Sequence, residues 1–270
     1  MSYPPHHEPL NPYEVDELSS VPAPNLPGEV VIRRDEEEVI EALAGDLYIH
    51  ALNCVRSFGD FHIALSGDRT TIPLYRRLML DPAYRQIPWR RTHLWLVQEK
   101  CVPFDHEDSH WRIIREIIGD HADIPPVQLH PVFSLSPAAD REYEKTLKET
   151  LAWREKGHDR LDYVLLTPEE QTVVTYPSFS DSQDDRNRFV RFHERDSDNM
   201  HHDRVCMTLK LITAARFIAV YANGNDLTSP AVKNVHPALT EKHSVRSLKP
   251  LQGELVWYMD EKAAWKMLRP

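Results

Sequence analysis

The amino-acid sequence predicts an α/β protein with a mostly parallel sheet that is covered by helices on both faces. Short apolar segments alternate along the chain with longer amphipathic ones, and parallel strands need such helical crossover connections. The chain has 270 residues, of which 41% are hydrophobic, so it is long enough for one large α/β domain or two small ones. Ligands of such sheets bind outside the carboxyl ends of the strands.

The first part of the chain contains three predicted strands, each followed by a predicted helix. The pattern predicts a strand at 29–32, and Asp35 then caps a helix through residue 58 with acidic residues in its first turn. A second strand is expected at 61–65, before a helix at 73–80 that ends at Asp81–Pro82. A third strand at 92–97 precedes a helix at 111–118.

The second part of the chain continues the alternation with longer polar loops. Glu and Lys at i, i+4 spacing predict a solvated helix at 138–156, and Asp260 caps a last helix at 261–268. The charged segment 179–203 is expected to be an exposed loop, as is 167–177, in which 172–176 could form a short strand. Further strands are expected at 127–132, 161–166, 205–211, 217–221 and 253–259, and a further helix near 230–234.

Residues 1–28 are rich in proline, which prevents regular helix and removes backbone donors. We expect this stretch to be an N-terminal arm, and residues 29–270 to be the folded domain. The arm could bind a protein partner or clasp a second subunit, or it could be a poorly ordered extension.

Composition excludes several classes of function. The formal net charge of −10 argues against a nucleic acid as the main partner, because phosphate backbones attract an excess of Lys and Arg. There is no apolar run long enough for a transmembrane helix, so no membrane partner is expected, and no signal peptide is evident. The three cysteines are far apart and indicate a reducing compartment without disulfides. The cytoplasm is therefore the predicted location.

The segment Ser66–Thr71 is the strongest local candidate for a binding site, because it joins a predicted strand to a predicted helix. The first turn of a helix has free backbone N–H groups that can hold a phosphate, helped here by the hydroxyls of Ser66, Thr70 and Thr71. Gly67 would allow close approach, and Arg69 would add positive charge. The other interpretation is a loop that caps its own helix, with Thr70 or Thr71 as the N-cap.

Five blocks of the sequence resemble the 6-phosphogluconolactonase family, within the wider glucosamine-6-phosphate isomerase superfamily. FHIALSGDRTTIPLY resembles the family's phosphate loop ALSGGSTPxxLY, and LVQEKCVPFDHEDS is similar to the segment that contains DERxVPxxHxxSN. Residues 161–177, 204–216 and 253–260 resemble the blocks that follow. The resemblance covers residues 29–265 and implies one domain with a modified Rossmann-like sheet. It also implies a small phosphorylated sugar or sugar acid as ligand, and hydrolysis by water alone with no cofactor.

Several departures fall on the family's site. Asp68 replaces a loop glycine and would repel a phosphate dianion, although Arg69 could offset this. Lys100 replaces the arginine of the DER motif, which keeps the charge but loses the planar fork. Gln171 stands where the family has the histidine understood to activate water, and glutamine cannot accept that proton. Thr172, beside it, is expected to contact the ligand.

Four residues could replace the missing base: Glu169, Glu170, His106 and His110, the last of which takes the place of a family asparagine. The group formed by His201, His202 and Asp203, with His193 nearby, has metal-binding residue types. Adjacent histidines in a polar loop do not easily face one ion, however, so no metal site is expected.

Three functions stay open at this point. The first is a 6-phosphogluconolactonase-like protein of pentose-phosphate type metabolism with an altered site that is weak or inactive. The second is a non-catalytic module that senses a sugar phosphate or binds a protein. The third is an active hydrolase or isomerase that acts on a different phosphosugar.

Overall fold

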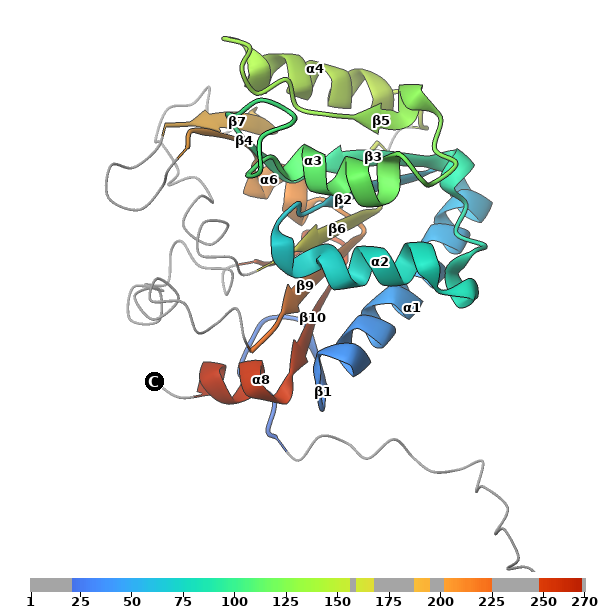
Figure 1. The fold of residues 1–270 in the computed structure, drawn as a ribbon, viewed down its shortest axis with the longest axis vertical. Helices are drawn as coiled ribbons and strands as arrows, with labels where there is room; N and C mark the ends of the chain where they lie inside the picture. The colour runs from blue at the N-terminus through green and yellow to red at the C-terminus, as the bar shows by residue number, and fades with distance from the viewer. Residues whose placement is uncertain (1–20, 156–158, 168–186, 195–201, 225–247, 269–270) are drawn as a thin grey trace, which may run out of the picture.

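The computed structural model describes residues 21–155, 159–167, 187–194, 202–224 and 248–268 (Figure 1). Its centre is a seven-stranded sheet in the order β1-β10-β9-β6-β2-β3-β5, and every pairing in it is parallel. The predicted α/β class with a mostly parallel sheet is therefore confirmed. The strands are β1 (Glu29–Arg33), β2 (Phe61–Leu65), β3 (Thr92–Leu96), β5 (Leu129–His130), β6 (Tyr163–Leu166), β9 (Phe217–Ala222) and β10 (Glu254–Asp260).

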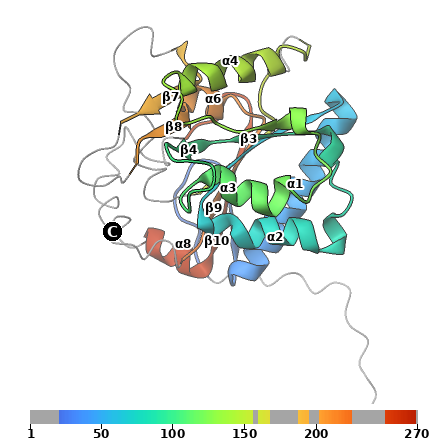
Figure 2. The ribbon, with the colours of Figure 1, turned by 45° about the horizontal axis from the view of Figure 1, so that its top comes forward.

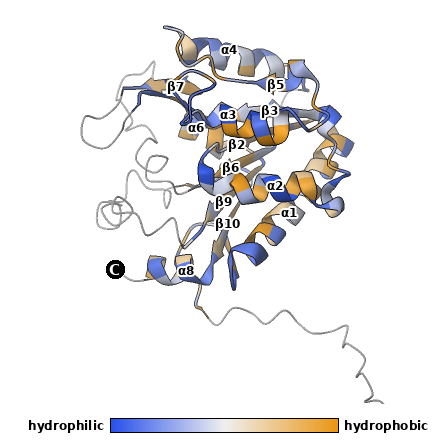
Figure 3. Ribbon diagram, viewed as in Figure 1, coloured by the Kyte–Doolittle hydropathy of each residue, from blue (hydrophilic) through white to orange (hydrophobic). Residues whose placement is uncertain are grey.

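The helices lie on both faces of this sheet. The right-handed crossovers put the helices after β1, β2 and β3 on one face, and those after β5 and β6 on the other. Figure 3 shows apolar and polar residues alternating around α1 and α2, as expected for helices with one buried side. The helices are α1 (Glu36–Phe58), α2 (Ile72–Leu80), α3 (His110–Ile114), α4 (Ala139–Leu151), α6 (Leu209–Thr213) and α8 (Glu261–Leu268).

A second, antiparallel sheet was not expected from the sequence. It consists of β4 (Gln98–Lys100), β8 (Arg204–Met207) and β7 (Val190–His193) in the order β4-β8-β7. The prediction of an exposed loop over 179–203 was wrong for 190–193. This strand alternates apolar and polar residues over only four positions and is only partly buried, so its pairing with β8 decides its conformation. Figure 2 shows this small sheet beside α4, which packs on β7 and β8.

Other predicted boundaries need correction. The predicted strand 205–211 ends at Met207, and Leu209–Thr213 form α6 because the chain turns there with Leu211 N–H donating to the Thr208 carbonyl. The predicted helix 138–156 ends at Leu151, after which Arg154 pairs with two aspartates of the sheet. The predicted helix 111–118 continues from α3 as a π-helical turn, Arg115–Gly119.

The end of the predicted arm packs on the domain. Val21 is buried, and the indole N–H of Trp257 in β10 donates to the carbonyl of Pro27 at 2.7 Å. Residues 1–20 and the helix expected near 230–234 lie outside the described residues, so the division at residue 28 stays a prediction. Among the described helices, none is both long and apolar enough to cross a membrane.

The topology marks one place in the sheet for a ligand. The chain runs from β2 to β3 on one side and from β6 to β9 on the other, although β2 and β6 are neighbours. Their carboxyl ends therefore form a topological switch point, where doubly wound folds bind ligands. The segment Ser66–Thr71 follows β2 there, and Thr167 follows β6.

Candidate functional site

The segment Ser66–Thr71 forms a short, tightly bonded loop at the switch point. The hydroxyl of Thr71 donates to the carbonyl of Asp68 at 2.8 Å, and the hydroxyl of Tyr75 donates to the carbonyl of Ser66. Residues 69–71 make one 3₁₀ turn that leads into α2. The loop therefore has a fixed shape, set by side chains of its own and of the helix that it begins.

Asp68 caps the 3₁₀ turn, and Thr71 is the N-cap residue of α2, one of the two threonines predicted for that position. The carboxylate of Asp68 accepts the backbone N–H of Thr70 at 2.9 Å, whereas the side chain of Thr71 makes no cap hydrogen bond. A carboxylate takes this place because it accepts several hydrogen bonds at once, whereas Thr71 uses its hydroxyl on backbone carbonyls.

The same carboxylate also receives the hydroxyls around the loop. Asp68 is 3% exposed and accepts from the hydroxyl of Ser66 at 3.3 Å and from the hydroxyls of Thr70 and Thr167. Arg69 lies away from this group, since its side chain is 67% exposed and its guanidinium is 3.8 Å from Glu107. The predicted offset of Asp68 by Arg69 therefore has no support in this geometry.

Glu99 holds the neighbouring part of the site. Its fully buried carboxylate accepts the backbone N–H groups of Lys100, His110 and Trp111 at 2.8, 2.8 and 2.7 Å, and the Ser109 hydroxyl at 3.2 Å. Burial raises the pKa of Glu99 to about 7. The four hydrogen bonds favour the carboxylate and lower the pKa, but their effect is smaller than that of burial. Glu99 thus fixes the end of β4 and the start of α3 relative to each other.

His110 is buried at the start of α3 and has a defined tautomer. Its Nδ1 lies 3.1 Å from the carbonyl of Gln98, so Nδ1 carries the proton and donates it. Nε2 then has a lone pair, which has no hydrogen-bond partner among the described residues. Burial, with the positive charges of Lys100 and Arg204, lowers the pKa of His110 well below 6.5. The ring is therefore neutral near pH 7.

Gly67 brings the loop and α3 into direct contact. A Cβ atom at this position would lie 2.4 Å from Cβ of His110 and 2.7 Å from its Cα and carbonyl oxygen. The loop after β2 and the segment after β4 therefore lie directly against each other.

Two basic residues lie at one end of the small antiparallel sheet, beside this site. Lys100 in β4 pairs in register with Arg204 in β8, whose side chain is 1% exposed. The ammonium of Lys100 lies 3.6 Å from Asp108. Burial opposes ionisation of Asp108, but Lys100, His202 and His106 outweigh it and lower its pKa.

The remaining predicted residues, Glu169, Glu170, Gln171 and Thr172, lie outside the described residues. The sequence did not single out Thr167, Glu99 or Arg204 as site residues. Thr167 could have been found as the polar residue directly after β6, and the other two stand inside blocks that carry the family resemblance.

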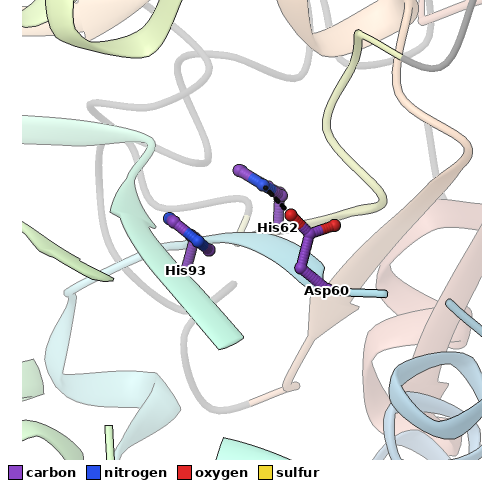
Figure 4. Close-up of side chains that lie close together, drawn as sticks. All are labelled: Asp60, His62 and His93. Atoms are coloured by element: carbon purple, nitrogen blue, oxygen red, sulfur yellow. Dashed lines mark hydrogen bonds and ion pairs between the residues drawn. The ribbon is translucent and has the colours of Figure 1, made fainter. Parts of the chain in front are cut away.

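Among the residues that the structure describes, two groups of side chains of metal-binding types lie together, and the second includes His202 from the set for which no metal site was expected. Figure 4 shows the first, Asp60, His62 and His93, in which Nε2 of His62 lies 3.2 Å from Asp60. The indole N–H of Trp95 donates to Nδ1 of His62 at 3.2 Å, so Nε2 carries the proton. A metal on Nε2 would require a proton on Nδ1, facing that indole N–H. The group is therefore a hydrogen-bond network.

The second group contains His106, Asp108 and His202. Nε2 of His202 lies 3.3 Å from Asp108, and Nδ1 of His106 accepts the backbone N–H of Asp108 at 3.1 Å. Lys100 places its positive charge beside the same carboxylate, where it would repel a metal ion.

Comparisons with known proteins agree with this fold. The family model described as glucosamine-6-phosphate isomerases/6-phosphogluconolactonase matches residues 34–257. The GDH/6PGL endoplasmic bifunctional protein of Homo sapiens is 30% identical over 234 residues, which are 83% of this chain and 28% of that protein. The 6-phosphogluconolactonase of Synechocystis sp. is 29% identical over 218 residues, which are 78% of this chain and 86% of that protein.

Solved structures show the same fold. A structure described as devB protein superimposes with a TM-score of 0.72 at 21% identity and covers 88% of this chain and 98% of its own. The 6-phosphogluconolactonase of Trypanosoma cruzi gives a TM-score of 0.70 at 19% identity, over 93% and 100% of the two chains. The matched region thus spans less than a third of the bifunctional relative but nearly all of these two solved chains.

Proposed function

Because the chain belongs to the glucosamine-6-phosphate isomerase/6-phosphogluconolactonase family, we propose that it is a 6-phosphogluconolactonase-like protein of carbohydrate metabolism with an altered site. Hydrolysis of a sugar-phosphate lactone at that site is weak or absent. The observation that carries the proposal is the contact of Gly67 with His110, which unites the Ser66–Thr71 loop with Lys100 in one site. In the same chain, Gln171 stands at the position that resembles the family's histidine.

The chemistry of lactone hydrolysis explains why the change matters. Water attacks the lactone carbonyl and gives up a proton, while the ring oxygen leaves and takes one. Gln171 cannot hold that proton near neutral pH. Lys100 and Arg204 still supply positive charge for an anionic ligand or for the oxyanion that forms. Binding without efficient proton transfer is the function that these residues support.

His110 supports a second candidate, an active hydrolase with a substitute base. Its neutral Nε2 has a lone pair without a partner among the described residues. Its lowered pKa makes it a weak base, however, because a general base works best with a pKa near the working pH. A bound anion would raise this pKa and improve the base.

A lactonase assay tests the proposal. We expect the purified protein to hydrolyse 6-phosphogluconolactone more slowly than a relative with the family histidine by a factor of about 10²–10⁴, which is the usual contribution of a general base. 6-Phosphogluconate should raise the melting temperature of the wild type, with a shift that grows with the logarithm of its concentration once the site is saturated. Lys100→Gln should abolish this shift, whereas Arg90→Gln, at an exposed pair with Asp123, should keep it.

Turnover as fast as that of the relative would refute the altered site. If His110→Asn then removed that turnover while the melting shift persisted, His110 would be the substitute base. No turnover and no shift with any sugar phosphate would refute the ligand class, and an interaction function, through this site or the N-terminal arm, would take its place.

A further inference from the structure

We infer that Asp68 determines ligand specificity: its carboxylate is an internal anion that occupies the donors of the Ser66–Thr71 loop and excludes phosphate from it. The inference rests on the proposed function and names the ligand class more closely. A loop that does not bind phosphate gives no preference for a phosphorylated ligand, so the protein should not distinguish strongly between phosphorylated and unphosphorylated sugar acids or lactones.

Asp68 already accepts hydrogen bonds from donors that a phosphate in the loop would need. One oxygen accepts the backbone N–H of Thr70 at 2.9 Å and the Thr70 hydroxyl. The other accepts the hydroxyls of Ser66, at 3.3 Å, and of Thr167. A phosphate in the loop would need these same groups, since a helix N-terminus binds an anion through its first N–H groups and nearby hydroxyls. A phosphate could bind only if the carboxylate moved away.

The carboxylate of Asp68 is also fixed in this place. Asp68 is 3% exposed, and its backbone carbonyl accepts the hydroxyl of Thr71 at 2.8 Å. Moving the side chain out would leave the N–H of Thr70 without its acceptor and the buried hydroxyls of Ser66 and Thr167, 3.1 Å apart, with only each other, which costs free energy. Ser66, with its carbonyl bound by Tyr75 and Thr71, cannot adapt easily either.

The negative charge of Asp68 opposes phosphate binding as well. A carboxylate and a phosphate dianion in one small loop repel each other, and burial strengthens the repulsion. Arg69, the nearest basic residue in the sequence, is 67% exposed and faces Glu107 at 3.8 Å. Arg69 therefore does not neutralise the charge of Asp68, which would repel an anion that entered the loop.

Two substitutions separate the space that Asp68 fills from the charge that it carries. Asp68→Gly restores the family's glycine and opens both the space and the donors. Asp68→Asn keeps the shape and removes the charge, and asparagine caps a helix as well as aspartate does. Glu107→Gln is the matched control, because it removes an exposed acidic side chain at the rim of the same loop.

The measurement is calorimetric titration at fixed ionic strength with inorganic phosphate, 6-phosphogluconate and gluconate. We expect Asp68→Gly to bind phosphate at least about tenfold more tightly than the wild type does, Asp68→Asn to gain less, and Glu107→Gln to gain nothing. The preference for 6-phosphogluconate over gluconate should be less than about tenfold in the wild type and should increase in Asp68→Gly. Circular dichroism and melting temperatures establish folding, and Asp68→Asn carries the test if Asp68→Gly does not fold.

The inference would be overturned if the wild type bound phosphate as tightly as Asp68→Gly, if Glu107→Gln gained as much, or if no folded variant at position 68 bound phosphate better. These results differ from failure of the proposed function. If the wild type neither hydrolysed the lactone nor bound 6-phosphogluconate or gluconate, the proposed function would fail. A gain of phosphate binding in Asp68→Gly would still support the role of Asp68.

Discussion

Gly67 has the tightest local constraint in the site, because the backbone of His110 occupies the space that any side chain would need. A Cβ atom would lie 2.4 Å from Cβ of His110 and 2.7 Å from its Cα. We expect Gly67→Ala to lower the free energy of unfolding by about 1–3 kcal/mol, as overpacking does, and to move the loop away from α3. Urea denaturation measures the loss.

Gly45 in α1 offers a matched control for that substitution. No atom lies within 4 Å of a Cβ built at this position, so Gly45→Ala should be stabilising by about 0.5–1 kcal/mol, as expected for a helix interior. Equal urea midpoints for Gly67→Ala and the wild type would show that the loop and α3 are not in contact in solution.

At the scale of elements, Arg154 joins the end of α4 to the start of β2 and β6. Its guanidinium donates to Asp60 at 2.8 Å and to Asp162 at 2.6 and 2.9 Å, and the Asp162 side chain is fully buried. Asp162 in turn accepts the backbone N–H of His62 at 2.7 Å and pairs with Arg216 at 3.0 Å. One ionic network therefore connects four segments at the end of the sheet opposite the candidate site.

Removing Arg154 should leave buried negative charge without its main partner. We expect Arg154→Gln to lower the free energy of unfolding by about 3–5 kcal/mol, the usual cost of breaking a buried pair, and high salt to change this little. Arg112→Gln removes an exposed pair with Glu116 and should cost much less, because water and salt screen such a pair. If thermal or urea unfolding gave both variants the same stability, the network would contribute only as a surface pair does.

At the scale of the whole molecule, the sequence predicts what depends on local pattern. Strands β1, β2, β3 and β9 lie within one residue of their predicted ends, because apolar runs bounded by polar turns specify them. The small antiparallel sheet was missed, since β7 has only four residues inside a charged segment and its pairing with β8 leaves no local signal. The position of the loop was predicted correctly, but the role of Asp68 depends on Thr167, 99 residues away. Contacts of that kind have no local signal.

A row of stacked histidines crosses three strands and links the stability of the whole fold to pH. The ring of His93 stacks on His62 with centroids 4.3 Å apart, and Nδ1 of His93 lies 3.1 Å from Nε2 of His130. Burial, with repulsion from the neighbouring rings, lowers the pKa of His93 to about 4 and that of His130 to about 3. Both rings are therefore neutral in the folded protein over a pH range in which the unfolded chain becomes protonated.

The sign of the effect follows from these two pKa values. Below pH 6.5 the unfolded chain binds protons that the folded protein does not, so each histidine lowers the free energy of unfolding by about 2 kcal/mol between pH 7.5 and 5. Glu99 acts in the opposite direction, because its pKa is raised to about 7 and its contribution is lost as the pH rises. The pH dependence of the wild type alone therefore cannot separate the contribution of the histidines from that of Glu99.

Comparison with His93→Gln does isolate one of them, since that variant keeps Glu99 and His130. Its free energy of unfolding should fall by about 2 kcal/mol less than that of the wild type when the pH drops from 7.5 to 5. His121→Gln, at an exposed position, should follow the wild type at both pH values. If the free energy of unfolding changed equally with pH in His93→Gln and in the wild type, His93 would be protonated as easily in the folded protein as in the unfolded chain.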